Sequence, residues 1–182
     1  QRYLQEVKAA SALSHPHIVR TLESGEADSC HFLVMEFLDG HDLWAIMRSQ
    51  SPLSVSWSCE VARQVALGLQ HAHEQGLVHR DIKPSNIIFV GDVPKLADIG
   101  LVTDVDASRS FVGTEGFLPP EGPGTPQADL YSLGKVLYEM STGKDRQDFP
   151  ELPTQLRELP DREGLVELNA VIMRACCHAP KD

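Results

Sequence analysis

The strongest constraint in this sequence is a polar segment, His79-Arg80-Asp81-Ile82-Lys83-Pro84-Ser85-Asn86, followed twelve residues later by Asp98-Ile99-Gly100. Apolar-patterned stretches lie on both sides, so the two polar segments are expected to form loops between regular elements. The first loop carries a carboxylate, an ammonium group and an amide. The second places a carboxylate after a strand-like run and before a glycine. Such groups can orient a hydroxyl and take its proton, offset negative charge, and bind Mg²⁺ through oxygen.

Hydrophobic periodicity predicts the regular elements that carry these loops. Three helix boundaries are marked clearly, because Thr125-Pro126 is a typical helix start and Gly76 and Gly143 are typical stops. The first half is predicted to contain a helix at 2–13, strands at 18–23 and 31–37 around a polar turn at 24–29, a short helix at 42–48 and a helix at 56–74. The second half is predicted to contain short strands and turns at 78–97, a loop at 100–124, and helices at about 125–143 and 163–177. A proline-punctuated linker at 144–162 joins these last two helices.

Composition excludes several classes of function. The formal net charge of -10 argues against a nucleic-acid partner, because phosphate binding needs clustered Lys and Arg. No apolar run reaches the length of a membrane helix, and no secretory signal is present. The four cysteines form no C-x-x-C pair, which favours reduced thiols and a cytoplasmic location. The chain begins at Gln1 rather than Met, so we expect a fragment of a longer protein.

The two polar segments, in this order and at this separation, resemble the catalytic and metal-binding loops of Hanks-type protein kinases, in particular bacterial Ser/Thr kinases. Further motifs fit the same family: Gly113-Thr114 with Pro119-Pro120-Glu121 resembles the end of an activation segment, and Asp129 to Gly134 resembles the start of the buried helix of the larger lobe. The resemblance implies an α+β, two-lobe kinase fold. Residues 1–38 would form a partial N-lobe and hinge, and residues 39–182 the mostly helical C-lobe.

The resemblance also implies roles for individual residues. Asp81 would orient and deprotonate the acceptor hydroxyl, Lys83 would offset charge on the transferred phosphoryl group, and Thr114 would brace both side chains. Asn86 and Asp98 would bind Mg²⁺. Lys83 together with Thr114 points to Ser/Thr rather than Tyr acceptors.

A second set of residues would bind ATP. By the same resemblance, backbone groups of Glu36 and Leu38 face adenine, Asp42 lies near the ribose, and Ile88 forms the floor beneath the base. Glu6 would sit on a helix and pair with a strand lysine that contacts the phosphates. ATP and Mg²⁺ are therefore the expected cofactors, and proteins with Ser or Thr acceptors the expected partners.

Each of these residues also has a plainer interpretation. Asp81 alone could be a solvated loop acid, Asp98 a turn former, and Glu6 an exposed helix residue. His79 is expected to be structural, buried with its ring bonded to backbone. Arg80 is either a surface charge or a binder of phosphate on the activation segment, where the candidate autophosphorylation sites are Thr103, Ser108 and Ser110.

The sequence departs from the family pattern ahead of the catalytic loop. Residues 1–5 hold neither a glycine-rich phosphate loop nor a strand lysine, and Ile99 and Pro119 replace the usual Phe and Ala. Two hypotheses therefore remain beside an active Ser/Thr kinase. One is a pseudokinase that acts as a regulatory binding scaffold, and the less favoured one is a small-molecule kinase on the same fold.

Overall fold

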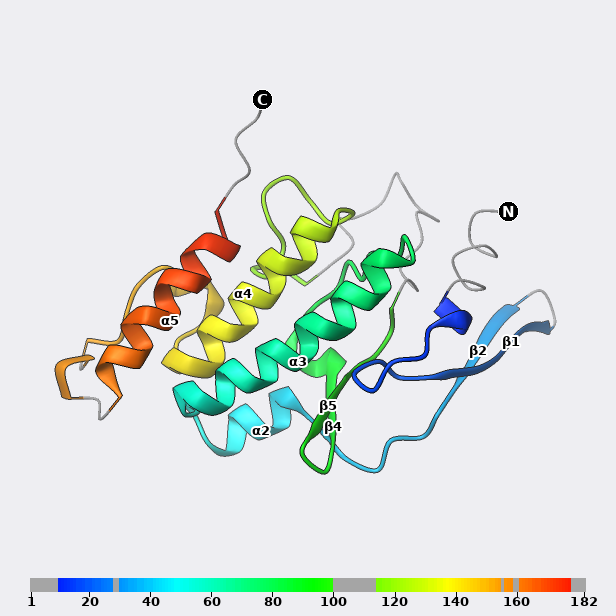
Figure 1. The fold of residues 1–182 in the computed structure, drawn as a ribbon, viewed down its shortest axis with the longest axis horizontal. Coiled ribbons are helices and arrows are strands. Elements are labelled where there is room, and N and C mark those ends of the chain that lie inside the picture. Colours follow the sequence, from blue (N-terminus) through cyan, green and yellow to red (C-terminus); the bar gives the residue numbers. More distant parts are fainter. Residues whose placement is uncertain (1–9, 28–29, 100–113, 155, 159–160, 178–182) are drawn as a thin grey trace.

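The structure is a computed structural model that describes residues 10–27, 30–99, 114–154, 156–158 and 161–177. It has mixed helices and strands, as predicted, with a small two-stranded sheet at one end and a mostly helical body at the other (Figure 1). The helices are α2 (Leu43–Ser49), α3 (Val55–Glu74), α4 (Pro126–Thr142) and α5 (Arg162–Ala175), and short 3-10 helices are η1 (Pro84–Asn86), η2 (Arg146–Asp148) and η3 (Leu156–Glu158). The strands are β1 (Thr21–Ala27), β2 (Cys30–Met35), β3 (His41–Asp42), β4 (Ile87–Val90) and β5 (Val93–Leu96).

The main core lies among α3, α4, α5 and the β4–β5 hairpin, and the three helices lie side by side (Figure 1). The predicted apolar stripe of α3 is confirmed, because Val61, Val65, Leu69 and Ala72 are all buried. Fully burying one aliphatic side chain the size of Val or Leu stabilises the folded state by about 1.5–3 kcal/mol. Most of α4 is buried on all sides, which makes it the central helix of this body. Among the described residues, no helix is long and apolar enough to cross a membrane.

The ends of α4 follow the predicted signals. Thr125 Oγ1 accepts the Ala128 N–H at 3.1 Å, and Pro126 occupies the first turn. Gly143 ends the helix with φ 69°, a left-handed conformation that glycine adopts without steric cost. These caps fix where α4 starts and stops, and so fix which of its residues face the loops described below.

The two sheets differ in part from the sequence prediction. β3, β4 and β5 form one antiparallel sheet, and β1 pairs with β2 in the other. The predicted turn at 24–29 is wrong over its first part, because β1 continues to Ala27 and pairs Glu26 with His31 and Ala27 with Cys30. Cross-strand backbone bonds satisfy these peptide groups, and that gain overrides the turn-like composition of the segment.

The segment before β1 is held against both β5 and α3. Val19 N–H donates to Leu96 O at 2.8 Å, and Leu96 N–H donates to His17 O at 2.9 Å. Gly68 of α3 faces the same segment, and a Cβ there would lie 2.9 Å from His17 O. The absence of a side chain at Gly68 therefore permits this close approach of helix and backbone.

We expect Gly68→Ala to lower the free energy of unfolding by about 1–2 kcal/mol, since the clash with backbone exceeds the gain in helix propensity. Gly164→Ala in α5 is the matched control, because its added methyl would meet the movable side chain of Asp161. The control should be neutral or slightly stabilising. Urea unfolding followed by circular dichroism measures both, and equal stability of the two variants would contradict the proposed close approach.

Candidate functional site

Asp129, near the start of α4, holds the backbone of the polar loop. Its Oδ2 accepts the His79 N–H and its Oδ1 accepts the Arg80 N–H, both at 2.8 Å. His73 of α3 adds its Nε2, 2.8 Å from Asp129 Oδ2. Asp129 is 1% exposed, so this buried carboxylate is compensated by three hydrogen-bonding groups.

These bonds explain why the loop is not a strand. Within the predicted strands and turns of 78–97, the backbone of residues 78–81 has no regular structure, as expected for the polar loop, and Arg80 has φ 73°. Positive φ costs energy in a residue other than glycine and persists where surrounding contacts impose it. Here the paired bonds to Asp129 supply that constraint.

His79 is fully buried beneath the loop, and Asp81 N–H donates to its Nδ1 at 3.3 Å. The structural role expected for His79, with its ring bonded to backbone, is confirmed. Burial lowers the pKa of His79, against the opposing effect of the nearby Asp129 carboxylate. The neutral imidazole is thus favoured, which leaves the ring as a fixed acceptor for the Asp81 amide.

The structure brings three of the predicted side chains into one hydrogen-bonded group. Lys83 Nζ lies 2.6 Å from Asp81 Oδ2 and donates to Thr114 Oγ1 at 3.1 Å. Thr114 Oγ1 in turn donates to Asp81 Oδ1 at 3.2 Å. Asp81 and Lys83 come from the polar loop and Thr114 from a segment 31 residues beyond Lys83, so their meeting is a product of the fold.

Asn86 lies in η1 at the end of the same loop. Its Nδ2 donates to Asp81 O at 2.8 Å and to Asp81 Oδ2 at 3.1 Å, which leaves the amide oxygen as the free end of that side chain. Asn86 O accepts the Ala97 N–H at 2.9 Å, so Asp98 follows directly from a residue bonded to Asn86. Asp98 has φ 63°, a backbone conformation that aspartate tolerates better than most residues.

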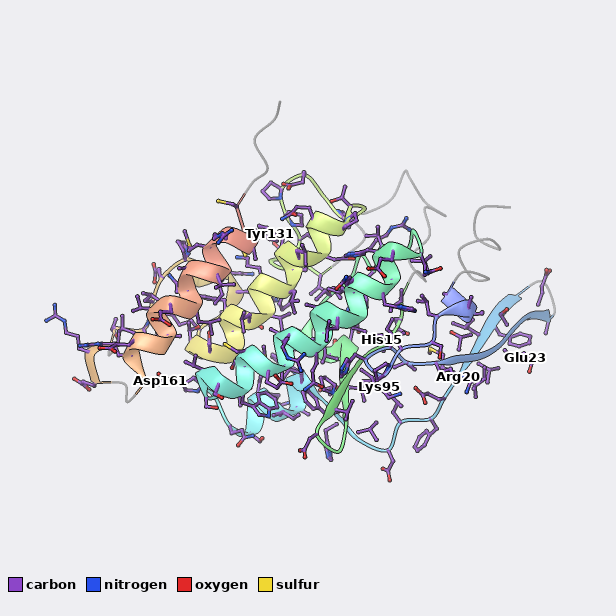
Figure 2. All side chains as sticks on the ribbon, viewed as in Figure 1. His15, Arg20, Glu23, Lys95, Tyr131 and Asp161 are labelled. Atoms are coloured by element: carbon purple, nitrogen blue, oxygen red, sulfur yellow. The ribbon has the colours of Figure 1, made fainter. Side chains whose placement is uncertain are left out.

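A third cluster surrounds Glu36, just after β2. Its Oε1 accepts Lys95 Nζ at 2.6 Å and the Arg20 N–H at 3.0 Å, and these bonds lower the pKa of Glu36. Figure 2 labels the two residues that Glu36 contacts, Lys95 on β5 and Arg20 ahead of β1. The Glu36 N–H donates to Arg20 O at 2.9 Å, so this backbone amide is already engaged within the protein.

Asp42 and Ile88 are neighbours across β3 and β4, where they form a register pair. Asp42 also caps α2, since its Oδ1 accepts the Ala45 N–H at 2.7 Å. Ile88 is half-buried between the buried Ile87 and Phe89 and faces away from the core they join. Leu38 is half-buried in the chain between β2 and β3. Glu6 and the candidate phosphorylation sites Thr103, Ser108 and Ser110 lie outside the described residues.

Sequence reasoning missed three contacts at or near this site: His73 with Asp129, Lys95 with Glu36, and Arg146 with Glu139 at 3.1 Å. A sequence signal existed for the last pair, because Glu139 interrupts an apolar run of α4 and is 4% exposed. A charge in such a position needs a partner. The identity of that partner depends on tertiary structure.

Comparisons with known proteins agree on one family. The family model described as "Protein kinase domain" matches residues 1–158. Serine/threonine-protein kinase PrkC of Bacillus subtilis is 34% identical over 155 residues, covering 79% of this chain and 24% of PrkC. Serine/threonine-protein kinase PknB of Mycobacterium leprae is 32% identical, covering 100% of this chain and 33% of PknB. The chain therefore spans between a quarter and a third of the length of these relatives.

A solved structure shows the same likeness. The kinase domain of PknI from Mycobacterium tuberculosis, determined as a point mutant, superposes with a TM-score of 0.74 at 29% identity. The match covers 98% of this chain and 70% of that one. The predicted α+β kinase fold is thereby confirmed.

We expect Asp129→Ala to destabilise the protein by about 3–5 kcal/mol, because it leaves two buried amides without their acceptor. The amide protons of His79 and Arg80 should also exchange faster with solvent. Asp145→Ala is the matched control, since the Asp145 side chain is 54% exposed, accepts the Gln147 N–H and makes a 3.6 Å ion pair with Arg146 Nη1. The control should cost about 1 kcal/mol or less. Equal losses in urea unfolding would contradict the role given to Asp129.

Proposed function

Because the chain belongs to the protein kinase domain family, we propose that it transfers the γ-phosphoryl group of ATP to Ser or Thr hydroxyls of proteins. One observation carries the proposal: the Asp81 carboxylate is bonded at once to Lys83, Thr114 and Asn86. A carboxylate held in this way has a fixed direction in which to meet an incoming hydroxyl.

Asp81 acts on the acceptor. The hydroxyl hydrogen-bonds to the Asp81 carboxylate, which orients its oxygen toward the γ-phosphoryl group and takes up its proton during transfer. A positioned base of this kind contributes about 10²–10⁴ in rate. Thr114 supports the base by donating to Asp81 Oδ1 at 3.2 Å, which limits rotation of the carboxylate.

Lys83 acts on the transferred group. Its ammonium lies 2.6 Å from Asp81 Oδ2, beside the position where the acceptor oxygen would sit. A cation there offsets the negative charge on the phosphoryl oxygens as they move toward the acceptor. Thr114 accepts a hydrogen bond from Lys83, so one hydroxyl positions both the base and the cation.

The donor set of Asn86 and Asp98 fits Mg²⁺. This ion takes oxygen ligands and is commonly bound by one or two protein carboxylates together with substrate phosphates. Asn86 offers an amide oxygen because its Nδ2 is engaged by Asp81, and Asp98 offers a carboxylate. When bound, Mg²⁺ would supply positive charge to the phosphates.

The adenosine end of ATP would lie across the short β3–β4 sheet and the chain before it. Glu36 would accept from adenine through its carbonyl, Leu38 would contribute a backbone group, and Asp42 and Ile88 would lie beside the ribose and base. The Lys95–Glu36 bond would support this arrangement by tying the segment after β2 to β5. Glu6 would support the phosphates through a lysine from another part of the protein.

We expect Asp81→Asn to abolish Mg²⁺-dependent transfer of labelled phosphate from ATP by the full-length gene product, because the amide cannot accept the proton. Asp92→Asn is the matched control, since Asp92 lies exposed in the turn between β4 and β5 and should leave transfer unchanged. Undiminished transfer by Asp81→Asn would refute the assignment. If the unsubstituted protein and both variants all fail to transfer phosphate while the protein still binds other proteins, a pseudokinase scaffold would instead be favoured.

A further inference from the structure

A cavity of about 200 Å³ opens directly beside the proposed catalytic group. Lys83 and Thr114, two of the three residues bonded to the Asp81 carboxylate, form part of its wall. Trp44 of α2 and Phe117 line it with aromatic surface. When the acceptor hydroxyl of a peptide lies at Asp81, a side chain a few positions away along the peptide can enter this cavity, because an extended chain advances about 3.3 Å per residue.

A second hollow of about 210 Å³ is lined in part by the same residues, Trp44 and Glu139. Met47 of α2 and Lys144 line this second hollow. The two hollows therefore border one another at α2 and α4.

Glu139 of α4 gives the first cavity an unusual wall. Its carboxylate is 4% exposed, and its Oε2 has no hydrogen-bond partner. Taken alone, a buried carboxylate with a free oxygen at this place would draw a Lys or Arg side chain of a substrate into the cavity.

Arg146, however, already occupies the position of that cation. Its Nη1 donates to Glu139 Oε1 at 3.1 Å, and its backbone N–H donates to the same oxygen at 3.0 Å. Its Nε donates to Glu115 O at 2.9 Å, and its guanidinium lies 4.5 Å from the centroid of the Phe117 ring. The arginine is therefore fixed on three sides, and its charge offsets that of Glu139.

We propose that this cavity is a side-chain subsite for the protein substrate and that the Glu139–Arg146 pair makes it select an uncharged apolar side chain near the acceptor Ser or Thr. The inference rests on the proposed kinase function for the identity of the substrate. Lys83, the other cation of the wall, is paired with Asp81, so the charges of Lys83, Arg146 and Glu139 each already have a partner of opposite sign. A charged side chain would have to displace one of these partners, while an apolar one packs on Trp44 and Phe117. The pair thus disfavours both charge signs at once.

Fluorescein-labelled peptides test the selectivity by binding alone, without ATP. The peptides contain one Ser and differ in one residue, Leu, Arg or Glu, placed in turn at each of the three positions on either side. At one of these positions, the unaltered protein should bind the Leu peptide about tenfold more tightly than the Arg or Glu peptide, a ratio ordinary for an apolar pocket. Equal affinities at every position would overturn the proposal.

Two variants should shift the preference in opposite directions. Arg146→Ala frees the Glu139 carboxylate and should raise the affinity of the Arg peptide relative to the Leu peptide by tenfold or more. Glu139→Gln leaves Arg146 uncompensated and should favour the Glu peptide. The double variant, Glu139→Gln with Arg146→Ala, removes both charges and should bind neither charged peptide preferentially. A ranking that stays unchanged in all three would overturn the proposal.

Controls separate this inference from folding and from the proposed function. Arg63→Ala removes an exposed arginine of α3 that pairs with Glu60, and it should keep the original ranking. The double variant contains no lone buried charge, so it reports on the subsite even where Arg146→Ala unfolds. Transfer to all peptides without binding preference would overturn the subsite and leave the kinase function standing. Selective binding without any transfer would support the subsite and overturn the proposed kinase function.

Discussion

The whole site depends on one buried charge, the carboxylate of Asp129. A carboxylate that is 1% exposed is costly unless hydrogen-bond donors surround it, and here the donors are the amides of His79 and Arg80 with the ring of His73. The requirement acts in both directions. The Asp129 carboxylate needs the loop amides as hydrogen-bond donors, and the loop needs the carboxylate to hold Arg80 at φ 73°. Only in that bent form does the chain present Asp81 toward Lys83 and Thr114.

Further short hydrogen bonds connect this loop to the rest of the site. Asn86 joins Asp81 to the backbone of Ala97, and that bond sets the position of the adjoining Asp98. Leu96, one residue earlier, accepts from Val19, so the segment leading into β1 is fixed to the same hairpin. Lys95 reaches Glu36 from the same strand. One short stretch, β5 with the Ala97 that follows it, therefore links the proposed base, the proposed metal ligands and the proposed adenine-binding segment.

How far sequence reasoning reached depended on how local each signal is. The start of α4 at Thr125, its stop at Gly143 and the apolar stripe of α3 were predictable, because caps and periodicity act over one to four turns of helix. The gathering of Asp81, Lys83 and Asn86 was predictable from their spacing on one loop. The pairing of Lys95 with Glu36 was not, since the residues are 59 positions apart and each resembles an ordinary surface charge. The continuation of β1 through 24–27 was missed for the same reason: its cause lies in the partner strand.

If both proposals hold, the two carboxylates of α4 let one helix act on both the chemistry and the selectivity. Asp129 and Glu139 are ten residues apart, which is about 15 Å along a helix axis. Both are buried, but the first is compensated by backbone amides of the polar loop and the second by Arg146 from the segment after α4. Substitution of Arg146 would therefore alter the charge of the cavity while the bonds that hold Asp81 stay in place. Under the proposed subsite, substrate preference would change through the sequence after α4 without loss of the proposed catalytic geometry.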